Sequence, residues 1–327
     1  MESTPTAGVV TVAAGSLAAC LASMPDPRRA ASIIYPLPAV LALAVAALLA
    51  GQVSVLAIAQ WAARQEPAQL AAFGFPPGRT PCQTTVHRLL RHLDVRALST
   101  LQQTAFAPAI TPAVEPLQGV AIDGKGQRGR LHRTGEHYAK HALCAMEHDT
   151  GRVLAHVPLG PRPTLPPTEL DAVPELIARL SWSARVLTAD RLFCQRAVCR
   201  SICQAGGDYL LPVGGNQPRL QAFVQACFTA AVPPRADQRV VTEEQGHGRT
   251  QERRDLTVVP IPPGASDWPG LAQVYRLVRT WQERGQTHHS IQDGITSLSP
   301  QHATPAQVLA LRRGHWIIEN TLHRQKD

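Results

Sequence analysis

The chain has 327 residues, 44% of them hydrophobic, so it is long enough to bury a sizeable core and to form about two structural units. Lysine and arginine number 32 against 24 aspartates and glutamates, and the resulting net charge of +8 suits nucleic acid or an anionic membrane surface. This composition excludes an intrinsically disordered chain. Seven cysteines without paired CxxC spacing argue against a disulfide framework or a zinc ribbon.

One stretch, residues 33–59, is a candidate membrane span. Its unbroken apolar part, Ala39 to Ala50, is too short to cross a bilayer. We therefore expect a buried helix, with a transmembrane span as the alternative. No basic region precedes Arg28, so we expect no signal peptide and a cytoplasmic location. Cys199 and Cys203 share a predicted helix and are expected to be buried in a reducing cytosol, with a metal-binding pair as the alternative.

Residues 1–107 are predicted to form a helical N-terminal domain. Helices are expected over about 38–49 and 53–64, and a third begins with Thr80 as N-cap and runs to Leu93. Arg88 and Arg91 lie off the apolar face of that third helix, which favours a helix-turn-helix-like DNA-binding unit. The alternative is an ordinary amphipathic helix with a solvated basic face. The proline-rich residues 108–118 are predicted to be a linker.

Two short apolar runs end in aspartate. Residues 120–122 read as a buried strand followed by Asp123, with Gly124 and Gly126 supplying a turn. Residues 185–189 repeat the design and lead to Asp190. A carboxylate with basic residues around it suits a divalent metal and a polyanionic substrate. The alternative is an aspartate that caps a turn.

The remaining elements predict a mixed α/β sheet. Strands are expected at 141–146, 152–157 and 208–213, and helices at 169–180 and 194–204. The order β-β-β-α-β-α-β indicates an antiparallel start and then crossovers to parallel neighbours. Residues 230–300 contain further strand-like pieces, including 255–261 and 274–279, and the last helix is expected over about 305–323.

A series of motifs runs along nearly the whole chain in a fixed order. They are Met24-Pro25-Asp26-Pro27-Arg28, Ala121-Ile122-Asp123-Gly124-Lys125 with Arg128-Gly129, Thr188-Ala189-Asp190 with Gln195, Gly207-Asp208-Tyr209, Gly215-Asn216-Gln217, Gly246-His247-Gly248-Arg249, and His315-Trp316-Ile317-Ile318-Glu319-Asn320. In these motifs the sequence resembles bacterial insertion-sequence transposases of the DDE type, in the branch that contains the H-repeat-associated proteins. The resemblance implies a ribonuclease-H-like catalytic domain over 119–327, with a β-rich insertion at about 230–300.

The resemblance also implies a metal-binding catalytic triad of Asp123, Asp190 and Glu319. These residues are 67 and 129 positions apart, so only the fold can bring them together. Three carboxylates can hold two Mg²⁺ ions, for which Mn²⁺ can substitute. The implied partner is double-stranded DNA, namely the terminal repeats of the element and the target. A homodimer in the synaptic complex and a nucleoid-associated location are also expected.

Several side chains are candidate DNA contacts, through phosphates or by stacking on an end base. They are Arg88, Arg91, Lys125, Arg128, Asn216, Gln217, His247, Arg249, Arg312, Arg313, His315, Trp316 and Asn320. Gly214 stands where the resembling proteins have lysine, and Arg191 where they have a small residue. The sequence stops at Asp327, shortly after Leu322-His323, which is consistent with a shortened copy of weak or absent activity.

Three functions are compatible with this pattern. The leading hypothesis is a transposase that cleaves and joins DNA at the ends of its own element. A remnant that binds DNA without catalysis is the first alternative, and a metal-dependent nuclease that cuts without joining is the second. Convergence of Asp123, Asp190 and Glu319 is the structural feature that separates the first hypothesis from the DNA-binding remnant.

Overall fold

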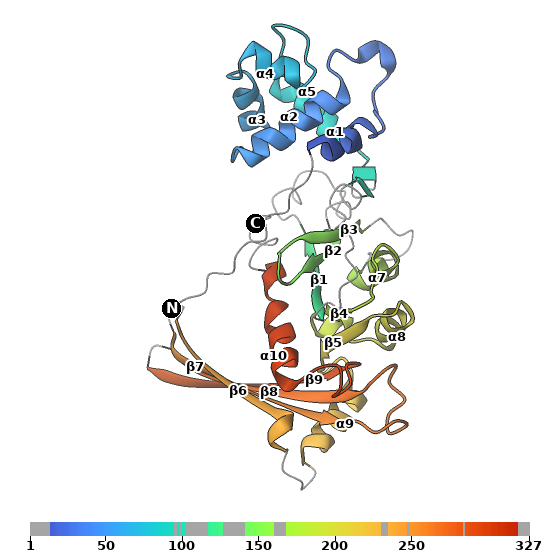
Figure 1. The fold of residues 1–327 in the computed structure, drawn as a ribbon, viewed down its shortest axis with the longest axis vertical. Helices are drawn as coiled ribbons and strands as arrows, with labels where there is room; N and C mark the ends of the chain where they lie inside the picture. The colour runs from blue at the N-terminus through green and yellow to red at the C-terminus, as the bar shows by residue number, and fades with distance from the viewer. Residues whose placement is uncertain are drawn as a thin grey trace. The chain divides into compact units, whose positions relative to one another are not determined.

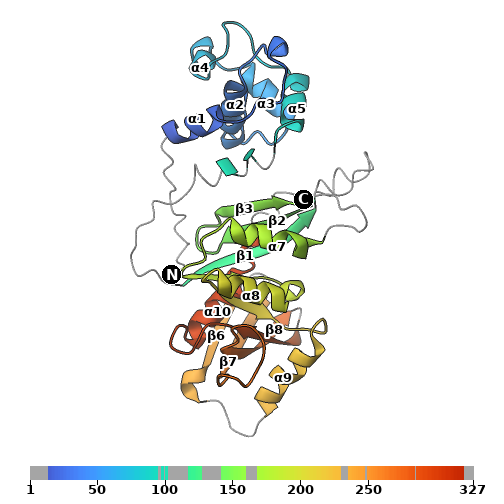
Figure 2. The same ribbon diagram turned by 90° about the vertical axis from the view of Figure 1, so that its right-hand side faces the viewer.

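The computed structural model describes residues 14–94, 97–98, 100–101, 117–126, 141–159, 168–229, 235–246, 249–283 and 285–319. The chain divides into two compact units, Met1–Thr111 and Pro112–Asp327, and each is described by itself (Figures 1 and 2). The predicted linker at 108–118 lies mostly outside the described residues.

The first unit is helical, as predicted. Its elements are α1 (Ala14–Ala22), a 3₁₀ turn (Ala30–Ser32), α2 (Leu37–Leu49), α3 (Val55–Ala62), α4 (Pro67–Ala72) and α5 (Gln83–Arg91). The apolar stretch that raised the membrane alternative is α2, whose Leu37, Val40 and Leu43 lie in the core of this unit. None of the described helices is both long enough and apolar enough to cross a membrane.

Helix α5 begins two residues later than predicted. Its N-cap is Cys82 rather than Thr80, because Cys82 is still extended at φ −73° and ψ 165°. The thiol of Cys82 contacts the hydroxyls of Thr84 and Thr85. The predicted faces are confirmed: Val86 and Leu89 are buried, whereas Arg88 and Arg91 are exposed.

The second unit contains a nine-stranded mixed sheet in the order β3-β2-β1-β4-β5-β9-β8-β7-β6. Its first five strands are β1 (Gln118–Gly126), β2 (His141–Glu147), β3 (Val153–Pro158), β4 (Arg185–Thr188) and β5 (Asp208–Pro212). β1 and β3 both pair antiparallel with β2, whereas β1–β4 and β4–β5 are parallel. The predicted antiparallel start and parallel crossovers are confirmed.

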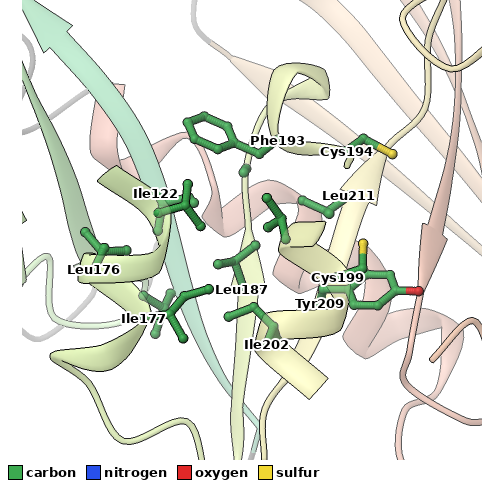
Figure 3. Close-up of a cluster of buried hydrophobic side chains, with 14 of the residues drawn as sticks. Ile122, Leu176, Ile177, Leu187, Phe193, Cys194, Cys199, Ile202, Tyr209 and Leu211 are labelled. Atoms are coloured by element: carbon green, nitrogen blue, oxygen red, sulfur yellow. The ribbon is translucent and has the colours of Figure 1, made fainter. Parts of the chain in front are cut away.

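Helices cover both faces of this sheet. α7 (Glu169–Ala178) and α8 (Arg196–Gln204) lie on one face, and α10 (Pro305–Gly314) lies on the other (Figures 1 and 2). The larger core fills the space between the strands and α7 and α8, where Ile122, Leu187 and Leu176 pack together (Figure 3). Alternate residues of a strand point to opposite faces, so Ala121 and Asp123 face α10 while Ile122 faces α7.

The predicted β-rich insertion is present and extends the same sheet. Its strands are β6 (Arg239–Gly246), β7 (Arg249–Pro260), β8 (Gln273–Glu283) and β9 (Gln286–Thr296), and α9 (Pro218–Thr229) and a 3₁₀ turn (Ala236–Gln238) precede them. The four strands form an antiparallel meander, and β9 joins it to β5 through three residue pairs, 210–212 with 294–296. The insertion is therefore continuous with the central sheet.

Two predicted element ends are wrong. The strand of Asp123 does not turn at Gly124, because β1 continues to Gly126 on its antiparallel partner β2. The last helix was expected to run to about residue 323, but α10 ends at Gly314, and a turn at 315–316 separates it from a short helical stretch over 317–319. Glycine has a low helix propensity, and the ring of His148 packs against Gly314.

Candidate active site

The register of two parallel strands places Asp123 beside Asp190. Ala121 pairs with Thr188 at the last parallel pair between β1 and β4, and each aspartate follows two residues later. Adjacent parallel strands therefore deliver the two carboxylates at the same level, at the carboxyl edge where ligands bind in sheets of this kind.

Each aspartate accepts a backbone hydrogen bond that fixes its carboxylate. The amide of Gly124 donates to Oδ1 of Asp123 over 2.8 Å. Asp190 caps the 3₁₀ turn Arg191–Phe193, and the amide of Leu192 donates to its Oδ1 over 2.8 Å. The alternative interpretation from the sequence, an aspartate that caps a turn, therefore also describes Asp190.

Glu319 follows α10, on the face of the sheet toward which Asp123 also points, and its charge acts on Asp123. The preceding residue, Ile318, is fully buried in a cluster with Ala121, Cys144 and Met146 of β1 and β2. That contact anchors the short helical stretch 317–319 on β1, two positions from Asp123. Glu319 itself is exposed to solvent.

The neighbouring carboxylates act on the titration of Asp123. The pKa of Asp123 is raised to about 7, first by burial and then by the negative charges of Glu169, Asp190 and Glu319, against the opposing hydrogen bond from Gly124. A nearby cation would offset this repulsion. As the described side chains are placed, no three His, Cys, Asp or Glu residues among them surround a single metal position.

Glu169 is a fourth carboxylate that the sequence pattern did not reveal. It opens α7, and a Cβ on Gly124 would lie 2.0 Å from its Cδ atom. Glycine at 124 therefore makes room for the Glu169 carboxyl next to Asp123, which is a close-approach role and not the turn that we expected. The structure has a capping box of Thr168 with Asp171 at this helix start, and acidic residues in the first turn after Thr168 were the sequence signal that could have pointed to Glu169.

The loop after β5 is tied to the turn after Asp190. Asn216 donates through Nδ2 to the carbonyl of Arg191 over 2.7 Å, and Gln217 donates to Oε1 of Gln195 over 2.9 Å. A Cβ on Gly214 would lie 3.1 Å from Cδ of Arg191. The side chain of Arg191, which is exposed, therefore lies beside Gly214, the position where the resembling proteins carry lysine. Arg191 keeps a positive charge at this place.

The predicted DNA contacts on α10 border a hollow of about 500 Å³ against the insertion strands. Its wall includes the arginines 254, 279, 312 and 313 together with Trp316. Trp316 is 46% exposed, and Arg313 forms an ion pair with Glu244. Arg312 is nearly buried and donates through Nε to Gln292 over 2.8 Å. Glu244 and Glu252 offset part of the positive charge of this hollow.

The prediction for His315 is wrong. We expected it to position a DNA base, but its side chain is 4% exposed and Nδ1 lies 3.4 Å from the buried hydroxyl of Thr188. The preceding helix directs this ring into the protein, so it is not presented to DNA. For Lys125 and Arg249 the backbone lies in β1 and β7 but the side chains lie outside the described residues, as do Arg128, His247 and Asn320 entirely.

The cysteine pair of α8 behaves as the apolar interpretation expected. Cys199 is fully buried and accepts a hydrogen bond from the indole of Trp268 over 3.3 Å. Burial raises the pKa of its thiol to about 12. A protonated thiol inside the core is a poor metal ligand, and the described residues around Cys199 and Cys203 form no metal-binding group.

Comparison with known proteins agrees with this fold. Residues 115–327 match the family described as Transposase DDE domain, and residues 18–104 match DDE_Tnp_1-associated, the domain that accompanies it. The chain belongs to the DDE transposase family, and its mixed sheet with flanking helices is ribonuclease-H-like.

Individual relatives are similar over most of the chain. A protein of Escherichia coli O157:H7 named "Putative transposase YncI" is 26% identical over 318 residues, which is 94% of this chain and 78% of that protein. An "Uncharacterized protein in dhlA 3'region" of Xanthobacter autotrophicus is 28% identical over 84% of this chain and 92% of its own length. The "H repeat-associated putative transposase YhhI" of Escherichia coli K12 is 26% identical over 64% of this chain and 55% of that protein.

Proposed function

We propose that this chain is a metal-dependent DNA strand transferase that cleaves and joins DNA at the ends of its own insertion sequence. The observation that carries the proposal is the parallel register of β1 and β4, which brings Asp123 and Asp190 to the same level of the sheet. Burial of Ile318 on β1 supports it, because it fixes the segment that leads to Glu319. Membership of the DDE transposase family supports this assignment.

Asp123, Asp190 and Glu319 are the residues that would hold Mg²⁺ or Mn²⁺. Their carboxylate oxygens are the donors that hard divalent cations prefer. The pKa of Asp123 is raised first by burial and then by the neighbouring carboxylates, and a cation would offset the second of these effects. When bound, two such ions would activate the attacking water or 3′-hydroxyl and stabilise the leaving oxygen.

The protein supplies the frame for this reaction. Asp123 and Asp190 are held by backbone hydrogen bonds, so their carboxylates are oriented before DNA arrives. Arg191, Arg313 and Trp316 are exposed and would bind phosphates and an end base of double-stranded DNA. Asn216 and Gln217 would act by fixing the loop next to Asp190. A homodimer would be required to bring two element ends together.

The test is cleavage of a labelled duplex that carries the element end, in Mg²⁺ or Mn²⁺. Asp190→Asn keeps the shape of the side chain and removes its charge, and we expect the cleavage rate to fall about a hundredfold or more. Asp267→Asn, in an exposed loop of the insertion, is the matched control and should cleave normally.

The other outcomes identify the alternatives. Cleavage that depends on Asp190 without joining to added target DNA would indicate a nuclease. Binding without cleavage in either metal, unchanged by Asp190→Asn, would contradict the enzyme proposal and indicate a DNA-binding remnant.

A further inference from the structure

Three buried polar side chains connect the segments that carry the candidate triad. His148, Thr188 and His315 are 8%, 1% and 4% exposed. Nε2 of His148 lies 2.9 Å from the hydroxyl of Thr188, and the same hydroxyl lies 3.4 Å from Nδ1 of His315. Buried polar groups are costly unless they are hydrogen-bonded, so these contacts restrict how the three segments can be placed.

The ring of His148 fits between two glycines from different elements. A Cβ on Gly119, at the start of β1, would lie 2.1 Å from Nδ1 of His148. A Cβ on Gly314, at the end of α10, would lie 2.2 Å from the same atom. No side chain larger than hydrogen is compatible with the ring at either position. The backbone amide of His148 also donates to the carbonyl of Gly119 over 2.9 Å.

Donors and acceptors can be assigned consistently along the hydrogen bonds from His148 through Thr188 to the carbonyl of Val120. Burial lowers the pKa of His148 to about 4, so the ring is neutral at pH 7 and carries a single N–H. With that proton on Nε2, His148 donates to Thr188. The Thr188 hydroxyl then donates to the carbonyl of Val120, which is 3.4 Å away in β1.

Each of the three contacted segments leads directly to one carboxylate. Gly119 precedes Asp123 by four residues in β1, and Thr188 precedes Asp190 by two at the end of β4. Gly314 and His315 lie five and four residues before Glu319. His148 itself comes from the turn after β2 and carries none of the candidate metal ligands.

We infer that His148 is a positioning residue for the triad, whose ring and hydrogen bond to Thr188 set the spacing between the start of β1, the end of β4 and the end of α10. This inference rests on the proposed function, because the spacing matters to catalysis only if the three carboxylates act together. The ring contacts neither DNA nor metal in this role.

The first test measures backbone hydrogen exchange over residues 309–319 in the full chain without metal. Thr188→Val removes the hydroxyl and keeps the side-chain volume, and we expect exchange there to be about five- to thirtyfold faster. Thr188→Ser keeps the hydroxyl and should exchange like the natural protein. The matched control is Tyr209→Phe on β5, which removes another buried hydroxyl, the one that donates to the carbonyl of Pro269 over 2.8 Å.

The Tyr209→Phe control separates a specific effect on the end of α10 from a general loss of stability of the unit. Fast exchange over 309–319 in Thr188→Val but not in Tyr209→Phe supports the inference. Equal acceleration in both variants, or none in Thr188→Val, overturns it.

The second test measures Mn²⁺ affinity by the electron paramagnetic resonance signal of free Mn²⁺, without DNA. Loss of residues that orient metal ligands typically weakens binding about 10- to 100-fold, and we expect a rise in Kd of that size for Thr188→Val. His148→Phe, which keeps a flat ring, should behave the same way. His148→Gln, which restores a donor near the position of Nε2, should recover part of the affinity. Unchanged affinity in Thr188→Val would overturn the positioning role.

The experiments distinguish failure of the proposed function from failure of the positioning role of His148. If the natural protein shows no Mn²⁺ binding that Asp123→Asn removes, the proposed function fails. In that case the exchange experiment still decides whether His148 and Thr188 hold the end of α10. Affinity for DNA in the presence of a chelator should be the same in the His148 and Thr188 variants, and a loss of affinity there would contradict a role confined to the triad.

Discussion

Asp123 is partly buried, accepts one backbone hydrogen bond and lies near three other carboxylates, and its pKa is raised to about 7. Isolated aspartates titrate near pH 4. At the scale of single residues, a proton and a metal cation would compete most directly for the carboxylate of Asp123. Metal binding requires the deprotonated carboxylate, so protonation of Asp123 should couple metal affinity to pH.

The sign of this coupling follows from the raised pKa. The folded metal-free protein holds the proton of Asp123 more tightly than the unfolded chain, so this stabilising contribution is complete below about pH 4 and is lost as the pH rises through about 7. Added Mn²⁺ should therefore raise the thermal unfolding midpoint more at about pH 8 than at about pH 5. Scanning calorimetry with chelator or with excess Mn²⁺ measures the difference.

Asp123→Asn is the control for that experiment. It should remove most of the pH dependence of the Mn²⁺ effect, because it removes the group whose pKa of about 7 lies between the two pH values. An Mn²⁺-induced shift of equal size at both pH values in the natural protein would contradict the assignment of Asp123 as a ligand.

The residues of the site differ in how far the sequence could predict them. Asp123 and Asp190 follow apolar runs, which is a local signal. Glu319 was identified through the family resemblance alone, since an exposed glutamate near a helix end has no distinguishing pattern. Glu169 and His148 were missed because their roles depend on contacts with Gly124, Gly119 and Gly314, which are distant in sequence.

At the scale of elements, the end of α10 is set by packing against the turn after β2. Alanine favours a helix over glycine by about 1 kcal/mol, so Gly314→Ala would be stabilising on propensity alone. Because the added Cβ would meet the ring of His148 at 2.2 Å, we expect a net loss of about 1–3 kcal/mol instead. Urea unfolding of the second unit measures this change.

A double-mutant cycle isolates the contact. In the background of His148→Ala the ring is absent, so Gly314→Ala should cost little or become stabilising, and the coupling energy should exceed about 0.5 kcal/mol. Additive effects of the two substitutions would show that Gly314 terminates the helix independently of His148.

The element order was predictable but the strand ends were not. Alternating strand and helix patterns gave β1 to β5 and the two crossover helices, and the parallel pairs followed from the crossover rule. The extension of β1 past Asp123 depends on pairing with β2, and the attachment of the insertion depends on three pairs between β5 and β9. Such long-range pairing leaves little trace in local sequence.

At the scale of the whole molecule, the chain combines a helical unit and a sheet-based unit, each with its own core. The net charge of +8 is shared along the sequence, so overall charge does not identify the DNA-binding surface. The basic face of α5 is the best-defined candidate in the first unit, since Arg88 and Arg91 are exposed on the side opposite Val86 and Leu89.

Replacing both Arg88 and Arg91 by alanine tests that surface. Each phosphate contact releases counterions, so log K falls with log salt by about 0.9 per contact. If both arginines contact phosphates of the element end, the double variant should bind more weakly and its salt slope should be smaller by about 2. Fluorescence anisotropy of a labelled duplex over a range of salt concentrations measures both quantities.

The control must lose the same charge elsewhere in the unit. Arg64 and Arg79 are exposed outside α5, and the double variant Arg64→Ala with Arg79→Ala lowers the net charge equally. If α5 contacts DNA, this control keeps the natural salt slope and its loss of affinity is small, because distant charges are screened beyond about 10 Å. Equal slopes in the two double variants would mean that the basic side of α5 is only a solvated helix face, and DNA recognition would then have to come from the sheet-based unit.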